Sequence, residues 1–384
     1  MLNALLAYPL RSGVTVSAAS RGSGIKMLNM GELFKYPRIP DVDMARVDLT
    51  GFDEERILLR PRDLMFARRS LTLEGAGKCS IVAQINEPTT WESSIIRARL
   101  DPSIADARFY FYYFSSPVGR RQMETIVEQV AAAGIRLTEL GKLFVPFPEL
   151  PAQQRIAEVL GALDDKIAAN IKLVGKADDF SQALFKSLVN ESASAPLSTT
   201  ARFVNGKAFT KGASGAGRVV IRIAELNSGI GGSTVFSDAT VGDDFLARPG
   251  DILFAWSGSL TLHRWFRPEG IVNQHIFKVI PNGYPSWLVY ELIRSRLAYF
   301  KGVAADKATT MGHILRGHLD ELVDVPTKSA IGRVDALMTS VWDRTLLAER
   351  ENETLAATRD ALLPQLMSGK LRVRDAEKVL EGVL

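Results

Sequence analysis

Residues 148–188 read PELPAQQRIAEVLGALDDKIAANIKLVGKADDFSQALFKSL, and this stretch decides the fold. Prolines 146, 148 and 151 cluster at its start, where they stop any preceding element, and none follows before position 196. Apolar residues then recur at spacings of three and four, at Ile156, Leu160, Leu163, Ile167, Ile171 and Val174. This is the stripe of an amphipathic helix that packs along a partner helix. We predict one helix from Ala152 to about Asn190, with Gly175 as a candidate interruption.

A second copy of this design lies at residues 329–371. Asp165, Leu184 and Leu188 recur 178 residues later as Asp343, Leu362 and Leu366. Upstream of the helices, Arg60-Pro61-x-Asp63-x-x-Phe66-Ala67 recurs at an offset of 188 as Arg248-Pro249-x-Asp251-x-x-Phe254-Ala255. Such a period is far too long for a solenoid repeat, so it indicates a duplicated module followed by a helix. We expect approximate two-fold symmetry within one polypeptide.

The helices alternate with two mixed modules, which gives four segments: residues 1–149, 150–192, 193–327 and 328–384. In the modules, short apolar runs at 81–83, 95–96, 219–223 and 252–255 lie between turn signals, as strands do. One helix is predicted in each module, over 109–114 after the start signal Asp101-Pro102-Ser103 and over 285–293. Residues 192–196, Ser-Ala-Ser-Ala-Pro, are predicted to form a hinge. The fold class is therefore α+β, with the long helices packed as an antiparallel coiled coil.

Composition narrows the class of protein. The chain has 384 residues, 46% of them apolar, which is enough for two or three domains with their own cores. Cys79 is the single cysteine, which excludes an internal disulfide, and the four histidines form no metal-ligand cluster. This cysteine usage favours a cytoplasmic protein. Arg11 interrupts the apolar start well before the roughly 20 residues of a membrane span, so we interpret the start as part of the first module. A net charge of +4 permits nucleic acid as a partner.

Three sets of motifs resemble a known family. Phe147-Pro148-Glu149-Leu150-Pro151-x-Gln153-Gln154-x-Ile156, followed by Leu163-Asp164-x-x-Ile167, resembles the central conserved region of type I restriction-modification specificity subunits. Arg359-x-x-Leu362-Leu363-Pro364-x-Leu366-x-Ser368-Gly369-Lys370-Leu371 resembles their distal conserved region. Gly250-Asp251-Ile252-Leu253, Trp256-Ser257-Gly258-Ser259 and Asn273-Gln274-His275 resemble a pattern of their target-recognition domains. The first module departs from it, with Arg68-Arg69-Ser70 in place of Trp-Ser-Gly-Ser. Together the motifs cover nearly the whole chain.

This resemblance implies a sequence-specific DNA-binding specificity subunit. Residues 1–149 and 193–327 would be target-recognition domains, each reading one half of a bipartite target in double-stranded DNA. The helical regions, 150–192 and 328–384, would set the gap and dock two methyltransferase (modification) subunits, and restriction subunits would join a larger complex. S-adenosylmethionine, ATP and Mg would belong to those partners, and this chain would hold no cofactor. A rigid spacer suits a duplex whose helical turn is about 34–36 Å.

No enzyme motif stands out in the sequence. Gly77-Lys78-Cys79 lacks the leading glycine and the hydroxyl residue of a P-loop. No Asn-Pro-Pro-aromatic sequence, of the kind that holds a flipped base, occurs either. We therefore expect a chain that catalyses nothing by itself. Two alternatives stay open: a stand-alone duplicated DNA-binding or scaffold protein that does not direct methylation, and a nucleic-acid enzyme with a carboxylate or metal cluster.

Polar and basic side chains in loops beside strand ends are the types that reach phosphates and base edges. The DNA-binding candidates are Arg21, Ser23, Lys26, Arg68, Arg69, Lys78, Lys207, Lys211, Arg218, Trp256, Ser257, His263 and Arg264; each is otherwise an ordinary loop residue. The candidates for docking a partner subunit are Gln153, Gln154, Arg155, Arg359 and Leu363, unless the helices only stabilise the fold. Trp256 and Trp265 are predicted to anchor the core or a loop. Residues 273–275 are predicted to form hydrogen bonds with buried backbone groups, and residues 110–114 to form a buried helix.

Overall fold

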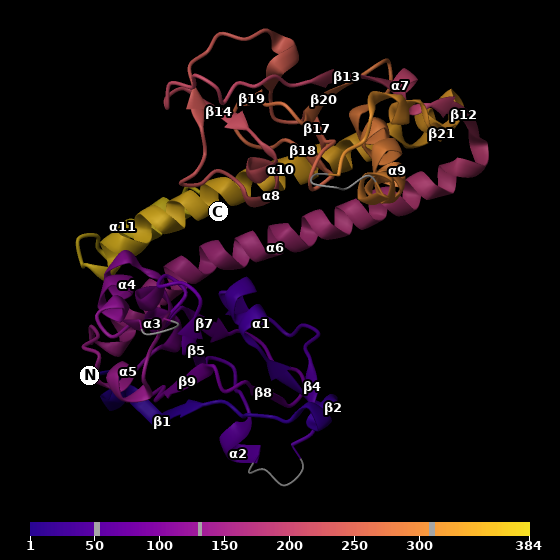
Figure 1. Cartoon of the computed structure of the whole chain (residues 1–384). Coiled ribbons are helices and arrows are strands. Elements are labelled where there is room, and N and C mark those ends of the chain that lie inside the picture. Colours follow the sequence, from indigo (N-terminus) through magenta and orange to yellow (C-terminus); the bar gives the residue numbers. More distant parts are fainter. Residues whose placement is uncertain (50–53, 130–132, 307–311) are drawn as a thin grey trace. The chain divides into compact units, whose positions relative to one another are not determined.

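The computed structural model describes residues 1–49, 54–129, 133–306 and 312–384. It forms two compact units, residues 1–166 with 355–384 and residues 167–354. Each unit combines one mixed module with parts of two long helices, α6 (Leu150–Leu188) and α10 (Lys328–Met367) (Figure 1). The α+β class is confirmed. The long helices are shared between the two units and do not form a separate body.

Within each unit, α6 and α10 pack antiparallel. In the first unit, Arg359 Nη1 donates a hydrogen bond to Asp164 Oδ1 at 2.7 Å. In the second, Asn170 Nδ2 donates to Asn352 Oδ1 at 3.1 Å. Residue numbers therefore rise along one helix as they fall along the other, which confirms the predicted antiparallel pair. The candidate interruption at Gly175 is absent, because α6 is one continuous helix through it.

The first module is built on a sheet with the strand order β1-β9-β5-β7-β3. Its strands are β1 (Leu6–Ser12), β9 (Ile95–Leu100), β5 (Leu64–Ala67), β7 (Cys79–Val82) and β3 (Arg38–Ile39). The smaller sheets β4-β2-β8 and β10-β11-β6 contain β4 (Arg46–Val47), β2 (Arg21–Leu28), β8 (Thr89–Trp91), β10 (Glu128–Gln129), β11 (Ala133–Gly134) and β6 (Arg69–Ser70). The helices are α1 (Met30–Lys35), α2 (Glu54–Ile57), α3 (Ala107–Ser115), α4 (Pro117–Glu124) and α5 (Leu137–Lys142).

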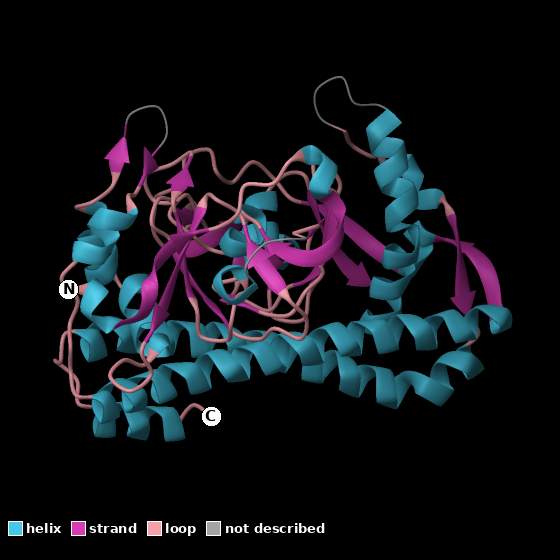
Figure 2. Cartoon of the chain, turned by 90° about the horizontal axis from the view of Figure 1, so that it is seen from below, coloured by secondary structure: helices cyan, strands magenta, loops and turns pink. Residues whose placement is uncertain are grey.

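The second module repeats this plan with the sheets β13-β20-β17-β18 and β15-β14-β19-β16. The strands are β13 (Ala201–Asn205), β20 (Ile276–Pro281), β17 (Ile252–Ala255), β18 (Thr261–Arg264), β15 (Phe236–Ser237), β14 (Arg218–Ile221), β19 (Gly270–Val272) and β16 (Leu246–Ala247). Its helices are α7 (Leu197–Thr200), α8 (Ile223–Ser228) and α9 (Ser286–Asp306), and α11 (Val373–Glu381) follows α10. Figure 2 distinguishes these short strands from the long helices.

The predicted duplication is confirmed at the turn before each central strand. The backbone N–H groups of Arg60 and Arg248 donate to the carboxylates of Asp63 and Asp251, both at 2.8 Å. Inside these turns, Arg62 (φ 73°) and Gly250 (φ 98°) share the left-handed backbone region. Glycine adopts that region freely, whereas an arginine is strained there. The backbone conformation is thus common to both modules although the residue type is not.

A second shared feature is a glycine that follows the first strand of each main sheet. A Cβ on Gly13 would lie 2.0 Å from the carbonyl oxygen of Trp91, and one on Gly206 would lie 2.1 Å from that of Asn273. Both contacts are impossible for a side chain, so each module requires glycine at this point. In both modules the chain passes the end of a parallel strand pair here, β2 with β8 and β14 with β19.

Two local predictions were wrong. Residues 192–196 form no hinge but the strand β12 (Ser192–Pro196), which pairs antiparallel with β21 (Leu322–Pro326). The helix of the first module begins later than its sequence signal. Asp106, not Asp101 or Ser103, is its N-cap, and the Asp106 side chain accepts from Arg108 N at 2.8 Å. Asp101 caps the preceding turn through Ser103. The buried helix at 110–114 is confirmed, because every side chain there is at most 5% exposed.

Candidate nucleic-acid interface

At the start of β2, two of the three predicted DNA-contacting residues are exposed. Arg21 and Ser23 face solvent, whereas Lys26 is buried. Lys26 Nζ lies 2.9 Å from Asp41 Oδ1 and 2.9 Å from Glu87 Oε1, and hydrogen bonds to these carboxylates raise its pKa. The buried ammonium group is therefore committed to the fold, and Arg21 and Ser23 are the accessible members of this group.

Around β6, Arg69 is exposed and Arg68 and Lys78 are half-buried. Lys78 Nζ donates to the carbonyl oxygen of Phe34 at 2.9 Å and lies 5.0 Å from the centre of the Phe34 ring. Burial lowers the pKa of Lys78. The sequence reasoning missed Leu71, which is 98% exposed two residues beyond Arg69. The accessible part of this turn is therefore Arg69 with an apolar side chain beside it.

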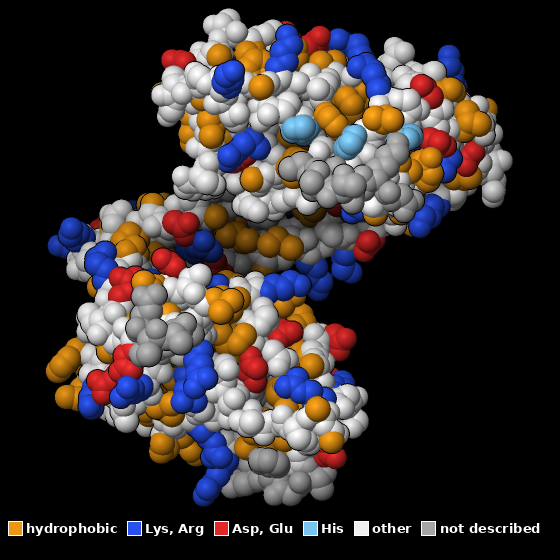
Figure 3. Space-filling view, viewed as in Figure 1, with side chains coloured by type: hydrophobic (Ala, Val, Ile, Leu, Met, Phe, Trp, Pro, Cys, Tyr) orange, Lys and Arg blue, Asp and Glu red, His pale blue; other side chains and the backbone are white. Residues whose placement is uncertain are grey.

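In the second module, three cations lie in and beside the loop that joins β13 to β14. Lys207, Lys211 and Arg218 are all exposed. Lys207 Nζ lies 4.5 Å from the centre of the Phe245 ring, and Arg218 Nε donates to Glu269 Oε1 at 2.6 Å. In the space-filling view, Lys and Arg side chains are spread over the visible faces of both modules and do not gather in one patch (Figure 3).

Residues after the central strand β17 are more buried than the sequence suggested. Trp256 is half-buried, and its Nε1 donates to Asn205 Oδ1 at 2.7 Å, which confirms its predicted role as an anchor. Ser257 is 3% exposed. Burial, with Arg267 nearby, lowers the pKa of His263 to about 4. His263 is therefore neutral at physiological pH and presents no positive charge to a phosphate.

The turn at 273–275 has the structural role that the sequence favoured. Asn273 is 5% exposed, and its Oδ1 accepts a hydrogen bond from the backbone N–H of Phe209 at 3.0 Å. His275 has a φ of 74°. Gln274 Oε1 and His275 Nδ1 are buried without a hydrogen-bond partner within the described parts of the chain. Asn273 thus binds a backbone N–H group of a neighbouring loop, and the left-handed backbone conformation of His275 is strained.

Near the start of α6, the predicted docking residues differ in exposure. Gln153 is completely buried; its Oε1 accepts from Asp106 N at 2.9 Å, and its Nε2 donates to the carbonyl oxygens of Ile104 and Pro148. Gln154 and Arg155 are exposed. A partner protein that binds this conformation can reach Gln154 and Arg155 but not Gln153.

At the end of α10, both candidates have contacts within the first unit. Arg359 pairs with Asp164 on α6, and the Tyr112 hydroxyl donates to the other oxygen of that carboxylate at 2.7 Å. Burial raises the pKa of Tyr112, so its hydroxyl stays protonated and keeps donating. Leu363 is 8% exposed. Through Asp164, Arg359 and Tyr112 join α10, α6 and α3 to one another.

Arg264, at the end of β18, also faces inward. It is 7% exposed, and its Nε donates to Glu349 Oε2 on α10 at 3.0 Å. Close by, both carboxylate oxygens of Glu291 accept from Arg294, at 2.6 and 2.8 Å. Burial, reinforced by the Asp178 carboxylate, raises the pKa of Glu291 to about 7, and burial also raises the pKa of Glu349. The second unit thus contains a buried group of charges that carries more carboxylates than guanidinium groups.

This burial makes the second unit less stable as the pH rises. In the folded chain Glu291 holds its proton up to about pH 7, whereas in the unfolded chain it releases it near pH 4.3–4.5. The stabilisation of the folded unit by protonated Glu291 is complete below the ordinary pKa and is lost as the pH rises through about 7. The free energy of unfolding changes by at most about 3 kcal/mol over this range. Glu291→Gln, which resembles the protonated acid, is expected to show a smaller decrease in melting temperature between about pH 5 and pH 8.

Thermal unfolding of both chains across this range checks the prediction. Glu353→Gln is a matched control, because Glu353 on α10 also pairs with an arginine of the second unit, Arg267, but its side chain is 49% exposed. The control should keep the pH dependence of the unmodified chain. Identical pH dependence in Glu291→Gln and the unmodified chain would show that Glu291 is not the group responsible.

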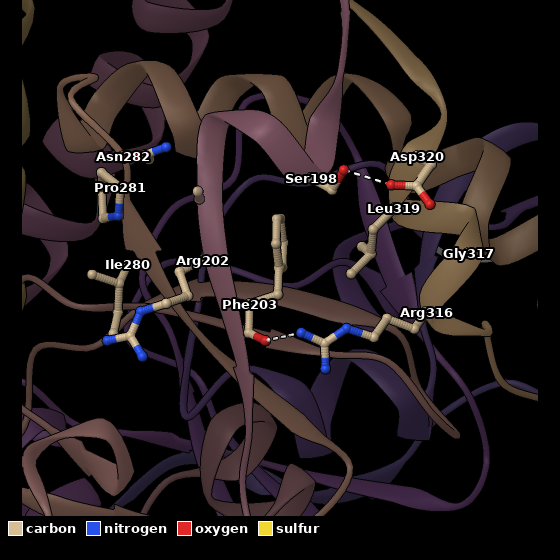
Figure 4. A pocket seen from close by; sticks show the side chains of 11 residues that line it. Ser198, Arg202, Phe203, Ile280, Pro281, Asn282, Arg316, Gly317, Leu319 and Asp320 are labelled. Atoms are coloured by element: carbon tan, nitrogen blue, oxygen red, sulfur yellow. Dashed lines mark hydrogen bonds between the residues drawn. The ribbon is translucent and has the colours of Figure 1, made fainter.

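A cavity of about 700 Å³ opens beside β13 and the 3-10 turn Arg316–Asp320 (Figure 4). Its charged groups are bound within the chain. Arg202 pairs with Asp244 at 2.6 Å, Ser198 Oγ donates to Asp320 Oδ1 at 2.5 Å, and Arg316 donates to a backbone carbonyl at 3.4 Å. None of the predicted site residues lines this cavity. The arginines, Ser198 and Asp320 in its lining are thus already bound to groups of the chain itself.

Two other kinds of site are absent from the described ranges. There, no three His, Cys, Asp or Glu side chains are grouped so that they could hold a metal ion. No helix among the same residues combines the length and apolar character that crossing a membrane requires.

Comparisons with known proteins agree with the resemblance. The family model of the type I restriction modification DNA specificity domain matches residues 41–173. A solved type I restriction-modification S subunit from M. genitalium aligns with a TM-score of 0.61 and 13% identity, over 95% of this chain and 94% of that one. At this identity the likeness shows the fold. An HsdS subunit from Thermoanaerobacter tengcongensis aligns over 96% of both chains at 14% identity and a TM-score of 0.35. No curated protein matches significantly in sequence.

Proposed function

We propose that the chain is a specificity subunit of a type I restriction-modification system and that it directs a DNA methyltransferase to a bipartite target; the family model over residues 41–173 and the likeness in fold support this. Residues 1–149 and 193–327 each read one half-site. The observation that carries this proposal is the duplication itself, two modules with the same turn and the same parallel strand pair, each attached to the same two antiparallel helices. Two readers on one chain suit two half-sites at a fixed spacing along the duplex.

The proposed DNA contacts come from the exposed candidates. They are Arg21, Ser23, Arg69, Lys207, Lys211 and Arg218. Lys26 and Arg264 are left out because carboxylates inside the fold bind their charges. Ser257 and His263 are left out because one is buried and the other is neutral. The cations supply affinity through phosphates, and the sequence of each half-site is read by polar groups at base edges.

The long helices are proposed to dock the methyltransferase subunits. Large apolar side chains are exposed on them, namely Ile171 and Phe180 on α6 and Leu337 and Leu347 on α10. We propose these exposed apolar side chains as contacts for the methyltransferase subunits. Amphipathic helices of a methyltransferase subunit fit such a surface. Gln154 and Arg155 would add polar contacts near the start of α6.

The reaction itself is assigned to the partners. We propose that this chain is non-catalytic and binds no cofactor. S-adenosylmethionine would be held by the methyltransferase subunits, and ATP and Mg by restriction subunits where these join the complex. The alternative, a stand-alone DNA-binding or scaffold protein, predicts tight binding by the isolated chain and no influence on methylation.

Removing Lys207 and Lys211 tests the proposed contacts. The double variant Lys207→Ala with Lys211→Ala is expected to weaken binding to target and non-target DNA alike, because phosphate contacts carry no sequence information. Each lost contact lowers the slope of log K against log salt by about 0.9, so the slope should fall by about 2. Dissociation constants of the methyltransferase complex, measured over a range of salt concentrations, give this slope.

Lys186→Ala is the matched control, since Lys186 is an exposed lysine on α6 outside the recognition modules. Its slope should equal that of the unmodified chain. A double variant with an unchanged slope, or a control with an equal decrease, would contradict the proposed contact set.

A further inference from the structure

We infer that Arg264 is a positioning residue that fixes the second module on the helix pair and so limits which gap lengths between half-sites the complex accepts. This inference rests on the proposed function. The sequence placed Arg264 among the DNA-contacting residues, in a loop after the central strand. Its side chain instead points into the second unit, toward both long helices.

The contacts of Arg264 hold it in one orientation. Its Nε lies 3.0 Å from Glu349 Oε2 on α10, and its Nη2 lies 3.9 Å from Asp178 Oδ1 on α6. The guanidinium carbon lies 4.7 Å from the centre of the Trp342 ring, also on α10. The Arg264 side chain is 5% exposed. One side chain of the recognition module thus contacts both helices, and a planar guanidinium group in such a site is strongly oriented.

Neighbouring contacts also attach the second module to the two long helices. On α9, Arg294 Nη2 donates to the backbone oxygen of Asp178 at 3.0 Å. Trp287 Nε1, also on α9, donates to Asp335 Oδ1 on α10 at 2.8 Å. Beyond β18, Arg267 Nη2 pairs with Glu353 on α10 at 3.2 Å. Arg264 lies among these contacts and is the residue among them that binds carboxylates on both helices.

The duplicated design shows that the fold does not require this arginine. Leu64 and Ile252 are equivalent positions in the two repeats of the central strand. Leu64 pairs with Ile81 on β7, and Ile252 pairs with Arg264 on β18. Ile81 is an apolar residue that is 5% exposed. The same place in the sheet is thus filled by an isoleucine in one module and by a buried cation in the other, so Arg264 serves the attachment to the helices.

A fixed joint limits the gap because DNA is helical. One additional base pair between half-sites moves the second half-site by about 3.4 Å and turns it by about 34–36° around the duplex. A module held by oriented, buried contacts cannot follow that rotation without breaking them. Without Arg264, the Glu349 carboxylate is left buried without its partner. The second module must then move away from α10 so that water can hydrate this carboxylate. The loosened module can then follow half-sites at neighbouring gap lengths.

The test uses the complete methyltransferase complex on a DNA library in which the gap varies by one or two base pairs on either side of the natural length. For Arg264→Leu we expect the preference for the natural gap over neighbouring gaps to fall about tenfold, while both half-site sequences stay the same. Arg264→Lys, which keeps the charge but loses the planar fork, should show a smaller decrease. It also supplies the readout if Arg264→Leu does not fold.

Two control variants distinguish loss of the Arg264 contacts from a general loss of stability. Arg333→Leu removes an exposed ion pair with Glu191 near the ends of the same helices, and Leu253→Ala opens a cavity in the core of the second module. Both should keep the natural gap preference. An unchanged gap preference in both Arg264 variants overturns the inference, and so does an altered half-site sequence, which would make Arg264 a DNA-reading residue. An unmodified chain that yields no bipartite methylated site at all refutes the proposed function instead.

Discussion

Exchange of residues 192–326 for the corresponding segment of a family member with another target is expected to change one half of the methylated site and leave the other half unchanged. The second module lies between β12 and β21, which pair with each other from Ser192 with Pro326 to Pro196 with Leu322. An exchange that carries both strands preserves this ladder. The first module keeps its own core, so its half-site should be read as before.

Methylated-base sequencing of cells that express the exchanged chain with the methyltransferase measures this result. The reciprocal exchange of residues 1–149 is the control and should alter the opposite half-site. A single exchange that changes both halves would contradict the assignment of one half-site to each module. Loss of all methylation by a chain that still folds and binds the methyltransferase would contradict it as well.

Asp63→Ala is expected to destabilise the first unit by about 3–5 kcal/mol, the usual effect of breaking a buried ion pair. Asp63 is 1% exposed, and its two oxygens accept from Arg99 Nε and Nη2, both at 2.7 Å. One oxygen also accepts from the backbone N–H of Arg60. Without the carboxylate, the Arg99 guanidinium is left buried without its counter-charge. For a unit of this size the melting temperature should fall by about 6–20 °C.

The duplication supplies a matched control at the equivalent position. Asp251 also caps its turn, but it pairs with Lys278 at 3.2 Å, and its side chain is 31% exposed. Lys278 is itself buried, but its Nζ keeps hydrogen bonds to the backbone oxygens of Asp243 and Leu246 when the carboxylate is removed, so Asp251→Ala should cost only about 1 kcal/mol. Calorimetry of both variants measures how much stability is lost at each site. Equal destabilisation would show that the buried Asp63–Arg99 pair contributes no more than the partly exposed one.

The parts of the fold that could be predicted from sequence are those whose signal is local or repeated. The apolar spacing from Ile156 to Val174 predicted a helix with one buried face; the helix is present, and Ile156, Leu160 and Leu163 are buried in it, but Ile171 of the same stripe is 61% exposed. The repeated Arg-Pro-x-Asp turn required the same backbone hydrogen bond twice, and it is present twice. Such patterns are decided within a few residues and do not depend on distant parts of the chain.

The wrong predictions depended on partners far away in the sequence. Residues 192–196 form a strand because residues 322–326 pair with them, and small residues alone gave no sign of it. Lys26 resembled a loop cation until Asp41 and Glu87 were seen beside it. Arg264 was assigned to DNA for the same reason. Whether a basic residue faces solvent or a buried carboxylate is decided by tertiary packing.

The candidate DNA surface was predicted in part. Arg21, Arg69 and Lys211 are exposed as expected, although only Lys211 lies in a turn; Arg21 and Arg69 are at the starts of the strands β2 and β6. Leu71 was missed, since the sequence alone gives no reason for a leucine in such a turn to be 98% exposed. Which exposed residues touch base edges stays a prediction, because exposure does not distinguish a base contact from a phosphate contact.

The most direct test of the central claim is detection of methylated bases across the genome of cells that express the methyltransferase subunits with and without this chain. The account predicts a methylated motif of two short half-sites around a fixed, unread gap that appears only when the chain is present. Identical methylation in both cells would contradict it, and the chain would then be a stand-alone DNA-binding or scaffold protein.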